Sequence, residues 1–487
     1  MMEFTLKEIA DACKGELFLK NGAEADICVT SVAIDSRKSE EGSVFLATIG
    51  EKVDGHRFIS QVFGAGAVLA ITQKTPEQVQ DETGVDCSDW GSYVLVEDTL
   101  QALKDIAEAY RLKVSIPIVG ITGSVGKTST KEFIAGVLEE KYNVLKTDGN
   151  FNNEIGVPLT LLRIRPEHEV AVVEMGISDF GEMHRLSKMV RPNVCVMTNI
   201  GQCHLENLKT RDGILQAKSE IFDFMAEDGE ICLNGEDDKL SSISEVKGRK
   251  PHFFGLGGNP VEEVWASRIE SHGLWGSDAV LELGDVGAGK KRLAAEKVEI
   301  HVPLPGVHMV LNAAAAACVA RLFGLSAEDI AAGIEKIQPV SGRNNLICLE
   351  KYTLIDDCYN ANPASMRAAI DLLAMADTEK VAVLGDMFEL GENSDALHAA
   401  VGQYAATAGI DTILCVGENA AHMFDAAVER AETTGHIAYF PTRDALLQAL
   451  EKEREEYIPD GCTVLIKASH GMEFGKVLEF LKAMGTK

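Results

Sequence analysis

Short apolar runs alternate with longer stretches of helical periodicity through the middle of the chain. The apolar runs cover residues 116–121, 143–147, 169–175, 194–200 and 230–233. Continuous apolar runs bounded by helices are typical of parallel strands that are buried on both faces of a sheet. The pattern therefore predicts a central α/β domain, residues 114–340, whose parallel sheet is covered on both faces.

The pattern changes before this central domain ends. Residues 251–305 are richer in glycine and tryptophan and alternate polar with apolar positions, which predicts a small antiparallel insert. Residues 306–323 and 327–337 return to helical spacing, so the domain is expected to close with two helices.

Residues 1–113 predict a small α/β domain. Helical spacing covers residues 6–13 and 100–112, and strand-like runs cover residues 29–34, 44–47, 64–71 and 93–97. Residues 113–117 are expected to form the hinge into the central domain.

Residues 341–487 predict a third α/β domain. Its expected strands are residues 346–349, 353–355, 381–384, 413–416 and 464–467, and its expected helices are residues 364–376, 395–408, 420–431 and 443–452. The alternation is typical of nucleotide-binding folds, although no G-x-G-x-x-G sequence follows the first strand. Three domains agree with a length of 487 residues, which is too long for one hydrophobic core.

Composition and charge narrow the function classes. Hydrophobic residues make up 46% and charged residues 25% of the chain, as in an ordinary soluble globular protein. The formal net charge of −29 argues against a nucleic-acid-binding protein, which requires a basic face, so no nucleic-acid partner is expected. The same charge does not exclude small anionic ligands, because local lysines and dipoles bind phosphate inside acidic proteins.

The cysteines and the N-terminal residues help to predict the cellular compartment of the protein. Eleven scattered cysteines without a C-x-x-C pair argue against disulfide and zinc frameworks and fit a reducing cytoplasm. The first residues lack the basic start and the continuous apolar core of a signal peptide. No run of about 18 apolar residues is present, so no membrane span is expected. These features predict a cytoplasmic protein.

The stretch IPIVGITGSVGKTSTKE, residues 116–132, combines a predicted strand, a glycine turn and a predicted helix. Such a turn directs backbone N–H groups inward, and the helix N-terminus adds positive partial charge, so the segment is suited to hold a polyphosphate. Lys127 would reach the β- and γ-phosphates, and Thr128 would bind Mg²⁺.

This stretch departs from the usual G-x-x-x-x-G-K-[ST] motif, because Ile121 occupies the first glycine position. It matches the shorter form G-x-x-G-K-T. The alternative is a simple glycine turn with a solvated lysine, but the strand, the helix and the hydroxyl cluster favour a phosphate loop. The residues expected to contact ATP here are Gly123, Ser124, Val125, Gly126, Lys127, Thr128 and Ser129.

Two side chains follow other predicted strands of the central sheet. Glu174 ends the run AVVEM, where a carboxylate is well placed to bind Mg²⁺, although an edge carboxylate facing water would give the same sequence. His204 lies just beyond the next strand and is equally compatible with a structural histidine and with a metal or phosphate contact. By composition alone, Lys218 is a solvated helix lysine.

Asparagines cluster in DGNFNNEIGVP, residues 148–158. Three amides in four residues, at Asn150, Asn152 and Asn153, suit hydrogen bonding to a polar substrate or a phosphate. Asparagine is also common in turns, so both interpretations stay open.

The same two interpretations, a ligand-binding segment or an ordinary turn, are open at the start of the third domain. The run DDCYNANP, residues 356–363, carries the polar side chains of Asp357, Tyr359, Asn360 and Asn362. Arg343, together with the strand-end Asp357, would suit the sugar and the phosphates of a nucleotide bound by the neighbouring domain. Neither residue is decisive alone.

Residues 35–37 and 48–58 of the first domain gather basic side chains beside flexible glycines, at Arg37, Lys52 and His56. The combination would suit an anionic ligand. On composition alone, a charged surface loop is the better interpretation.

Taken together, these stretches resemble the motifs of the Mur ligases, the ATP-dependent amide-forming enzymes of peptidoglycan precursor synthesis. They are GITGSVGKTSTKE, TDGNFNNEIGVP, VVEMG, TNIGQCHLE, AKSEIF, PGVHMVLNAAAAA, SGRNN, DDCYNANPASM, LGDMFELG and KASHGM, in order across nearly the whole chain. YNANPASM and GDMFELG are similar to the family member that adds D-alanyl-D-alanine to UDP-N-acetylmuramoyl-tripeptide. The Asp-Asn-Pro-Arg motif of the member that adds the third amino acid is absent from the sequence.

The resemblance implies an α/β protein of three domains. Residues 1–113 would bind the UDP-substrate, residues 114–340 would form a central P-loop parallel-sheet ATPase domain, and residues 341–487 would form a Rossmann-like C-terminal domain. The implied cofactors are ATP and two magnesium ions, and the implied partners are UDP-N-acetylmuramoyl-tripeptide and D-alanyl-D-alanine. We expect a monomer.

The resemblance also assigns roles to single residues. Lys127 and Thr128 would bind the ATP phosphates and Mg²⁺, Glu174 would ligate that ion, and His204 would ligate a second one. Lys218 matches the lysine that is carbamylated in the family, a modification that turns an ammonium into an anionic metal ligand.

Further roles concern the nucleotide and the substrates. Asn312 would meet adenine, and Arg343 and Asp357 would close onto the nucleotide from the third domain. The residues expected to act in catalysis are Lys127, His204, Lys218 and Arg343. The residues expected to bind substrate are Ser36, Arg37, Asp54, Gly55, His56, Asn150, Asn152, Asn153, Tyr359, Asn360 and Asn362.

Three other functions compete with this interpretation. A folylpolyglutamate-type ligase would share the fold, but the long first domain and the YNANP stretch argue against it. A regulatory ATPase usually carries aspartate where this chain has Glu174. A non-catalytic binding module would not need both Lys127 and Glu174.

Overall fold

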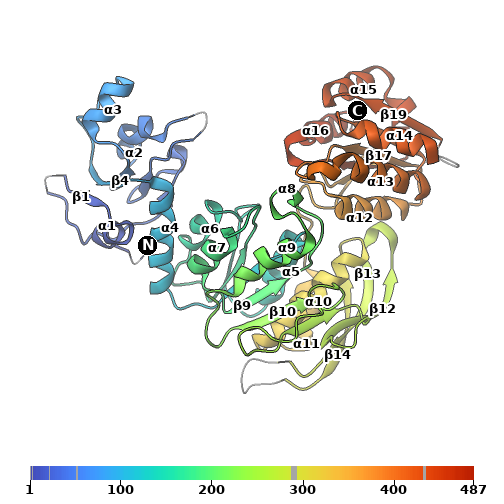
Figure 1. Ribbon diagram of the computed structural model, residues 1–487, viewed down its shortest axis with the longest axis horizontal. Coiled ribbons are helices and arrows are strands. Elements are labelled where there is room, and N and C mark those ends of the chain that lie inside the picture. Colours follow the sequence, from blue (N-terminus) through green and yellow to red (C-terminus); the bar gives the residue numbers. More distant parts are fainter. Residues whose placement is uncertain are drawn as a thin grey trace.

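The structure is a computed structural model that describes residues 2, 4–20, 22–50, 53–286, 293–430 and 435–486. Three β-sheets follow one another along the chain, and helices pack against each of them (Figure 1). This arrangement confirms the predicted α/β class with three domains. Lys52 and residue 431, which the sequence analysis included in a loop and a helix, lie outside the described residues.

The first sheet has the strand order β1-β5-β4-β3-β2. Its strands are β1 (Glu16–Phe18), β2 (Val32–Ala33), β3 (Val44–Leu46), β4 (Leu69–Thr72) and β5 (Ser92–Leu95), and the helices around it are α1 (Leu6–Cys13), α2 (Ile59–Gly64), α3 (Pro76–Thr83) and α4 (Thr99–Lys113). Strands β2 to β5 pair in parallel, and β1 pairs antiparallel with β5. Helix α1 has the predicted bounds because a capping box between Thr5 and Glu8 fixes its start.

In the first domain, some elements predicted from the apolar pattern differ from those in the structure. The strand predicted at residues 64–71 is wrong over its first half, because Gly64 ends α2 and the chain then turns through Gly66, which has a φ of +98°. The strand predicted at residues 29–34 shortens to β2. Helix α3 was not predicted, because only Val79 is buried on it and its apolar periodicity is therefore weak.

The central sheet has the strand order β14-β13-β12-β11-β10-β9-β6-β8-β7. Its strands are β6 (Ile118–Thr122), β7 (Val144–Lys146), β8 (Val170–Glu174), β9 (Val194–Met197), β10 (Glu230–Asn234), β11 (His252–Gly255), β12 (Val264–Ser271), β13 (Ser277–Leu283) and β14 (Glu296–Val302). Its helices are α5 (Lys127–Leu138), α6 (Gly156–Leu161), α7 (Glu182–Val190), α8 (Leu205–Leu208), α9 (Arg211–Ser219), α10 (Val307–Leu322) and α11 (Ala327–Glu335).

The small antiparallel insert predicted at residues 251–305 is confirmed for the pairing of β12, β13 and β14 but is wrong for β11. Strand β11 pairs in parallel with β10, and β12 pairs in parallel with β11, so these residues extend the central sheet. Only β12, β13 and β14 pair antiparallel with one another. All four residues of β11 are buried, which is the burial expected inside a parallel sheet and not at the edge of an insert.

Both faces of the central sheet are buried, as predicted, in the parallel strands β6, β8, β9 and β11. Ala171 and Val173 of β8 belong to a hydrophobic cluster that includes residues of α6, α7 and α9. Val170 and Val172 of the same strand belong to a second cluster, which includes residues of α5, α10 and α11. Successive strand residues point to opposite faces, so each strand supplies both clusters.

Helix α4 joins the first domain to the central domain. Its residues Ile106 and Tyr110 belong to the same hydrophobic cluster as Leu69 of β4 and Leu186 of α7. The Tyr110 hydroxyl donates a hydrogen bond to the carbonyl oxygen of Ile164 at 2.7 Å. The first sheet, α4 and one face of the central sheet therefore share one continuous hydrophobic core.

Hydrogen bonds hold the end of α4 against the central domain, next to the hinge predicted at residues 113–117. Arg111, near the end of α4, donates hydrogen bonds to the carbonyl oxygens of Val190 and Val114, each at 2.8 Å. Helix α4 is therefore held against the central domain before the link begins, and residues 113–117 form a short connection in which Lys113 and Ser115 are exposed.

The third sheet has the strand order β15-β16-β20-β17-β18-β19. Its strands are β15 (Asn345–Cys348), β16 (Thr353–Asp356), β17 (Lys380–Gly385), β18 (Thr412–Val416), β19 (His436–Phe440) and β20 (Thr463–Lys467), and its helices are α12 (Pro363–Ala374), α13 (Ser394–Thr407), α14 (Ala420–Arg430), α15 (Arg443–Tyr457) and α16 (Gly475–Gly485). All pairs are parallel except β15 with β16. The sequence analysis missed β19 and α16.

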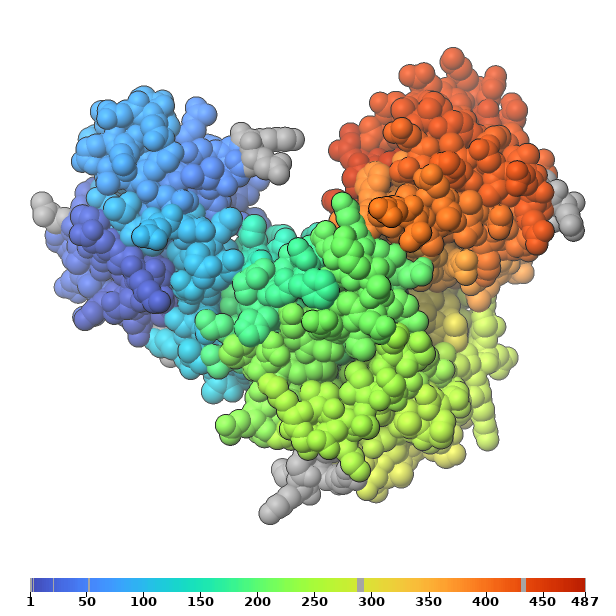
Figure 2. Space-filling model, viewed as in Figure 1, coloured from blue at the N-terminus to red at the C-terminus, as the bar shows by residue number. Residues whose placement is uncertain are grey.

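The C-terminal domain has two hydrophobic clusters of its own, one on each face of its sheet. Leu274, at the tip of the hairpin between β12 and β13, packs against one of them. In the space-filling view, the first and third domains stand apart on either side of an open cleft above the central domain (Figure 2). Within the described residues, no helix combines the length and the apolar character needed to cross a membrane.

Candidate active site

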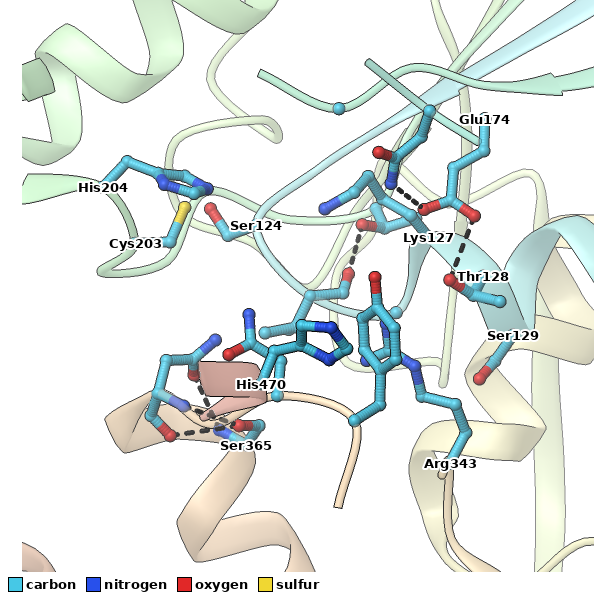
Figure 3. Close-up of a pocket in the computed structure, with 18 of the residues that line it drawn as sticks. Ser124, Lys127, Thr128, Ser129, Glu174, Cys203, His204, Arg343, Ser365 and His470 are labelled. Atoms are coloured by element: carbon cyan, nitrogen blue, oxygen red, sulfur yellow. Dashed lines mark hydrogen bonds between the residues drawn. The ribbon is translucent and has the colours of Figure 1, made fainter. Parts of the chain in front are cut away.

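A cavity of about 800 Å³ lies where the central domain faces the C-terminal domain. It sits at the carboxyl ends of β6, β8 and β9, which is where parallel sheets bind their ligands. The predicted residues that line it are Ser124, Val125, Gly126, Lys127, Thr128, Ser129, Asn152, Asn153, Glu174, His204, Asn312, Arg343, Asp357, Tyr359, Asn360 and Asn362. The cavity therefore brings together residues from two domains (Figure 3).

The phosphate loop connects β6 to α5. Gly123 and Gly126 have φ values of +151° and +82°, which favour glycine. A Cβ atom on Gly123 would lie 1.9 Å from Oγ1 of Thr198, so no larger residue fits there. The first turn of α5 begins at this loop, and the N–H groups of a first turn lack acceptors within their own helix. The loop therefore has the geometry that binds a phosphate.

The loop after β9 holds the phosphate loop in place. The N–H groups of Ser124 and Val125 donate to the backbone oxygen and the side-chain oxygen of Asn199, each at 3.0 Å. The Thr198 hydroxyl donates to the carbonyl oxygen of Val125 at 2.6 Å. Ser124 and Val125 line the cavity, but their N–H groups already have acceptors, so the N–H groups facing a phosphate belong to the residues after them.

Glu174 is buried at the end of β8, with 1% of its surface exposed, so it is not an edge carboxylate facing water. Its Oε2 accepts a hydrogen bond from the Thr128 hydroxyl at 3.0 Å, and its Oε1 accepts one from the Asn152 amide at 2.8 Å (Figure 3). These two hydrogen bonds connect three residues that were predicted to belong to the site, Thr128, Asn152 and Glu174. They place a carboxylate and a hydroxyl oxygen side by side next to the phosphate loop.

Two lysines at the site, Lys127 and Lys218, are desolvated by burial. Burial lowers the pKa of Lys127, an effect that the Glu174 carboxylate opposes and the Arg343 charge strengthens. The Lys127 amine folds back over the loop and donates to the carbonyl oxygen of Gly123 at 2.9 Å.

Lys218 is also buried, with 1% of its surface exposed, so the expectation of a solvated lysine is wrong. Burial, together with the nearby Lys127 charge, lowers the pKa of Lys218 to about 8. Among the described residues, its amine forms no hydrogen bond or ion pair. Lys218 lies behind the cavity wall and does not line the cavity itself.

His204 contacts the C-terminal domain. Its Nδ1 lies 2.6 Å from Oε2 of Glu389, and both residues have left-handed backbones, with φ of +50° and +61°. The adjacent His204 ring lowers the pKa of Glu389. Figure 3 shows His204 on the other side of Lys127 from Glu174. His204 thus pairs with a carboxylate across the domain boundary, and its role as a metal ligand stays a prediction.

The site contains oxygen ligands suitable for magnesium. Within the described ranges, no three His, Cys, Asp or Glu side chains converge to form a metal site. Mg²⁺ at a nucleotide site usually needs only one or two protein ligands, because phosphate oxygens and waters complete its octahedral coordination. The adjacent oxygens of Thr128 and Glu174, 3.0 Å apart, fit this requirement.

Arg343 enters the cavity from the first residues of the C-terminal domain. Its guanidinium lies 4.0 Å from the ring centroid of Tyr359. Asp356 accepts a hydrogen bond from the N–H group of Gly342 at 2.8 Å and so fixes the segment that carries Arg343. Gly342 has a φ of +75°, and a Cβ atom there would lie 3.0 Å from Cβ of Tyr359, so this close approach requires glycine.

Asp357 forms a buried ion pair with Lys467, at the end of β20. Lys467 also donates to the carbonyl oxygen of Asn360 at 3.1 Å. The side-chain oxygen of Asn362 accepts a hydrogen bond from the N–H group of Ser365 at 2.9 Å and caps α12. These cavity residues therefore hold the C-terminal wall in shape, and Lys467 is a member of it to which the sequence analysis gave no role.

Comparisons with known proteins agree with this geometry. The family described as "Mur ligase family, catalytic domain" matches residues 29–111, "Mur ligase middle domain" matches residues 121–320, and "Mur ligase, glutamate ligase domain" matches residues 342–470. A relative from Escherichia coli (strain K12), named UDP-N-acetylmuramoyl-tripeptide--D-alanyl-D-alanine ligase, is 35% identical over 100% of both chains. This chain belongs to the Mur ligase family.

Other relatives cover the chain equally well. The protein of the same name from Bacillus subtilis (strain 168) is 33% identical over 99% of both chains. Among solved structures, MurF from Acinetobacter baumannii is 32% identical, with a TM-score of 0.84 over 99% of both chains. The MurF ligase from Thermotoga maritima in complex with ADP is 28% identical, with a TM-score of 0.77 over 94% of this chain and 99% of that one.

A further Acinetobacter baumannii structure is named UDP-N-acetylmuramoylalanyl-D-glutamyl-2,6-diaminopimelate--D-alanyl-D-alanyl ligase. It is 31% identical, with a TM-score of 0.81, and covers 99% of this chain and 98% of that chain. The resemblance inferred from the sequence is therefore confirmed at the level of the family.

In this Mur ligase, the amide of Asn312 lies on α10 beside the phosphate-loop helix. Its side-chain oxygen accepts a hydrogen bond from the Thr130 hydroxyl at 2.9 Å. One turn earlier, His308 meets the side-chain amide of Asn344 at 3.0 Å, which connects α10 to the segment that carries Arg343. Burial lowers the pKa of His308, while the Asp357 carboxylate opposes that shift. Asn312 lines the cavity, and its contact with adenine stays a prediction.

The three clustered asparagines have different surroundings in this Mur ligase. Asn152 binds Glu174, as described above. Asn153 accepts hydrogen bonds from the N–H groups of Ile155 and Gly156 at 3.1 and 2.9 Å, which orders the start of α6. Asn150 is exposed and does not line the cavity.

The residues expected to hold the UDP-sugar lie in two short turns of the first domain, η1 (Ser36–Lys38) and η2 (Gly55–Phe58), outside this cavity. Arg37 pairs with Asp35, yet its side chain is 85% exposed. Ser36 precedes it in η1. An exposed guanidinium is compatible both with a surface loop and with an anionic ligand.

His56 does not fit a direct contact with substrate. Its ring is buried, its Nδ1 lies 2.5 Å from Oδ1 of Asp54, and its Nε2 accepts a hydrogen bond from the N–H group of Gln73 at 3.1 Å. Both ring nitrogens hold the loop that starts at Asp54 and Gly55. A Cβ atom on Gly55 would lie 2.8 Å from a backbone oxygen, so that position requires glycine.

The sequence analysis missed several supporting residues of this Mur ligase site. Thr198 and Asn199 belong to the TNIG stretch, but no role was predicted for them. Their position directly after a buried strand could have indicated that they belong to the site. Lys131, with 1% of its side chain exposed, donates to the carbonyl oxygen of Thr147 at 2.8 Å and fixes the start of the asparagine loop. The sequence gives little indication that Lys131 is buried, because a lysine in a helix is usually solvated.

Proposed function

We propose that this protein is an ATP-dependent ligase that joins D-alanyl-D-alanine to UDP-N-acetylmuramoyl-tripeptide in peptidoglycan precursor synthesis. The observation that carries the proposal is the cavity in which a phosphate loop, the Glu174–Thr128 pair and Arg343 of the C-terminal domain face one another. The full-length relatives with this activity in their names support the choice of substrates. A phosphate loop alone would not choose between this reaction and another use of ATP.

For the nucleotide, we propose that ATP binds with its phosphates over residues 123–129 and its adenine near Asn312. The Thermotoga maritima relative was solved in complex with ADP, which supports nucleotide binding by a protein of this fold. Arg343 would approach the phosphates from the C-terminal domain, and Asp357 would maintain the wall beside it through its ion pair with Lys467.

We propose that two magnesium ions bind with the nucleotide. Thr128 and Glu174 would hold the first, and His204 and Lys218 would hold the second once His204 has left Glu389. Bound magnesium supplies charge neutralisation and polarisation at the γ-phosphate.

We propose that Lys218 is carbamylated. An uncharged amine reacts with CO₂ to give a carbamate and a proton, which converts a cation into an anion. The buried amine without a hydrogen-bond partner supports this modification, because a buried ammonium in that position would be strongly destabilising.

The two acceptor sites follow from the domain order. We propose that Ser36, Arg37, Asp54 and Gly55 of residues 1–113 hold the UDP-sugar, with His56 shaping their loop. The tripeptide would extend over Asn152 and Asn153 of residues 114–340. Tyr359, Asn360 and Asn362 of residues 341–487 would form the wall where D-alanyl-D-alanine binds.

The proposed reaction has two steps. The free carboxylate of the tripeptide attacks the γ-phosphorus of ATP and releases ADP, and Lys127 offsets the charge of the two approaching anions. The amino group of D-alanyl-D-alanine then attacks the acyl carbon, the C–N bond forms, phosphate leaves, and the amine loses a proton. Closure of the C-terminal domain would exclude water, which otherwise hydrolyses the acyl phosphate.

We further propose that the reaction takes place in the cytoplasm, where ATP is available. All eleven cysteines lie within the described ranges and are free thiols, which agrees with a reducing compartment.

The proposed function predicts doubly dependent phosphate release. The purified protein, given ATP, Mg²⁺ and UDP-N-acetylmuramoyl-tripeptide, is expected to release phosphate at its full rate only when D-alanyl-D-alanine is present. Mass spectrometry should then detect a UDP-linked pentapeptide. Steady release that is indifferent to both substrates would support a regulatory ATPase and contradict the proposal.

Arg343→Ala is expected to lower turnover about 10- to 100-fold and to leave the affinity for UDP-tripeptide within about twofold, because Arg343 acts on the phosphates from the C-terminal domain. Steady-state kinetics and calorimetric titration measure the two quantities separately. Arg367→Ala, which removes another arginine that stacks on a tyrosine of the same domain, is the matched control. Parental turnover in Arg343→Ala would remove Arg343 from the mechanism.

A further inference from the structure

One end of the cavity extends away from the phosphate loop toward the first domain. Lys104 of α4, Glu154 before α6 and Glu182 of α7 all line it. Because α4 packs against α6 and α7, two domains build this wall (Figure 1). A peptide whose UDP-sugar is held by the first domain would lie along this wall when its carboxylate reaches Lys127.

The carboxylates at this end already have partners. Arg185 binds Glu154 through two hydrogen bonds, Nε to Oε1 at 2.6 Å and Nη2 to Oε2 at 3.1 Å. Glu182 accepts hydrogen bonds from the N–H groups of Ser178 at 2.7 Å and Asp179 at 3.3 Å. Neither carboxylate depends on Lys104 for its hydrogen bonds.

The ammonium of Lys104, by contrast, has N–H donors that form no hydrogen bond within the described residues. Its contact with Glu154 measures 3.5 Å, which is long for a hydrogen bond, and an ammonium has three N–H donors. The side chain is 20% exposed and lines the cavity. Within the described residues, no second acceptor contacts the amine. A half-buried cation with unused N–H donors at a cavity wall favours an anionic group on the ligand.

We infer that Lys104 binds a free carboxylate on the peptide of the UDP-linked substrate. The inference rests on the proposed function. In a peptide of the sequence alanyl-D-glutamyl-2,6-diaminopimelate, the glutamyl residue keeps one free carboxylate, and diaminopimelate keeps one besides the carboxylate that reacts. A peptide with lysine in third place keeps only the glutamyl carboxylate. Lys104 is therefore a residue that selects for an acidic peptide.

The test is Lys104→Met in the full-length protein, because methionine keeps an unbranched apolar stem and removes the charge. The KM for UDP-tripeptide is measured with three substrates: one with diaminopimelate in third place, one with lysine there, and one with diaminopimelate in third place and the glutamyl carboxylate converted to an amide. Loss of a charged hydrogen bond is expected to raise KM about 10- to 100-fold, with kcat and the KM for ATP close to parental values. Lys104→Arg should recover most of the affinity.

Lys188→Met is the matched control. Lys188 pairs with Glu108 at 3.0 Å across the same contact between α4 and α7, but it does not line the cavity. This variant should therefore have the parental KM for all three substrates.

The pattern of KM values identifies the carboxylate. A rise confined to the two substrates with diaminopimelate assigns the contact to that residue, and a rise that disappears only with the amidated peptide assigns it to the glutamyl residue. Parental KM values for Lys104→Met, an equal rise for all three peptides, or an equal rise in Lys188→Met would overturn the inference. If the parent protein neither binds UDP-tripeptide in calorimetry nor forms product, the proposed function fails, and the inference fails with it.

Discussion

Lys127→Ala is expected to lower ligase turnover about 100- to 1,000-fold, the cost of removing one charge-stabilising donor from a water-poor reaction site. The Lys127 amine lies at the centre of the site, over the carbonyl oxygen of Gly123 and within electrostatic reach of both Glu174 and Arg343. An approaching carboxylate and a γ-phosphate repel each other, and no other lysine of the phosphate loop offsets that repulsion. Phosphate release and UDP-pentapeptide formation measure the loss.

Calorimetric titration of UDP-tripeptide should give the parental affinity for Lys127→Ala, since we propose that the first domain holds the UDP-sugar of that substrate. Lys141→Ala is a suitable control, because Lys141 follows the end of α5 outside the cavity, where its amine donates to the carbonyl oxygen of Gly324 at 3.0 Å and lies over the Tyr142 ring. It should keep parental turnover. Parental turnover in Lys127→Ala itself would exclude the phosphate loop from the chemistry.

Lys218→Met is expected to reduce turnover by a similar factor, and it should also remove a spectroscopic signal. The parent protein, incubated with ¹³C-bicarbonate, should show a carbamate carbonyl resonance that is absent from the variant. With the pKa of Lys218 lowered to about 8, about one tenth of its amine is uncharged at pH 7, against about one part in a thousand or less for an ordinary lysine.

The same pKa fixes the sign of the pH dependence. The uncharged amine that reacts with CO₂ increases as the pH rises through about 8, so the resonance should strengthen from pH 7 to pH 9 and fade below pH 7. Lys131 is an internal comparison, because it is equally buried but donates to the carbonyl oxygen of Thr147. A parent spectrum without a carbamate resonance at pH 9, or a Lys218→Met variant with parental turnover, would contradict the assignment.

Features set by neighbouring residues were predictable from the sequence. The phosphate loop, the ends of α1 and the buried strand that ends at Glu174 each depend on a contiguous stretch, in which apolar spacing, glycine and a capping pair act locally. The three sheets followed for the same reason, because alternating strands and helices constrain the fold class.

Features that depend on long-range pairing were not predictable in this way. Strand β11 reads as part of a glycine-rich, alternating segment, yet its pairing with β10 makes it a buried strand of the central sheet. The support that Asn199 gives the phosphate loop spans 74 residues, and the ion pair between Lys467 and Asp357 spans 110 residues. Nothing in the local sequence states which of two distant polar residues will meet.

Burial of charged side chains was the other source of error. Composition describes Lys218 as a solvated lysine and His56 as part of a charged surface loop, whereas the fold buries both side chains. The family resemblance supplied a role for Lys218 that its local sequence did not.

The continuous core that α4 creates has a consequence for how the chain unfolds. The first and central domains share one hydrophobic cluster, so loss of packing at Ile106 weakens both, and the two are expected to melt as a single cooperative unit. The C-terminal domain, with clusters of its own, can lose its structure without that unit. A substitution inside the domain assigned to the UDP-substrate is therefore also a change in the thermal stability of the domain that carries the phosphate loop.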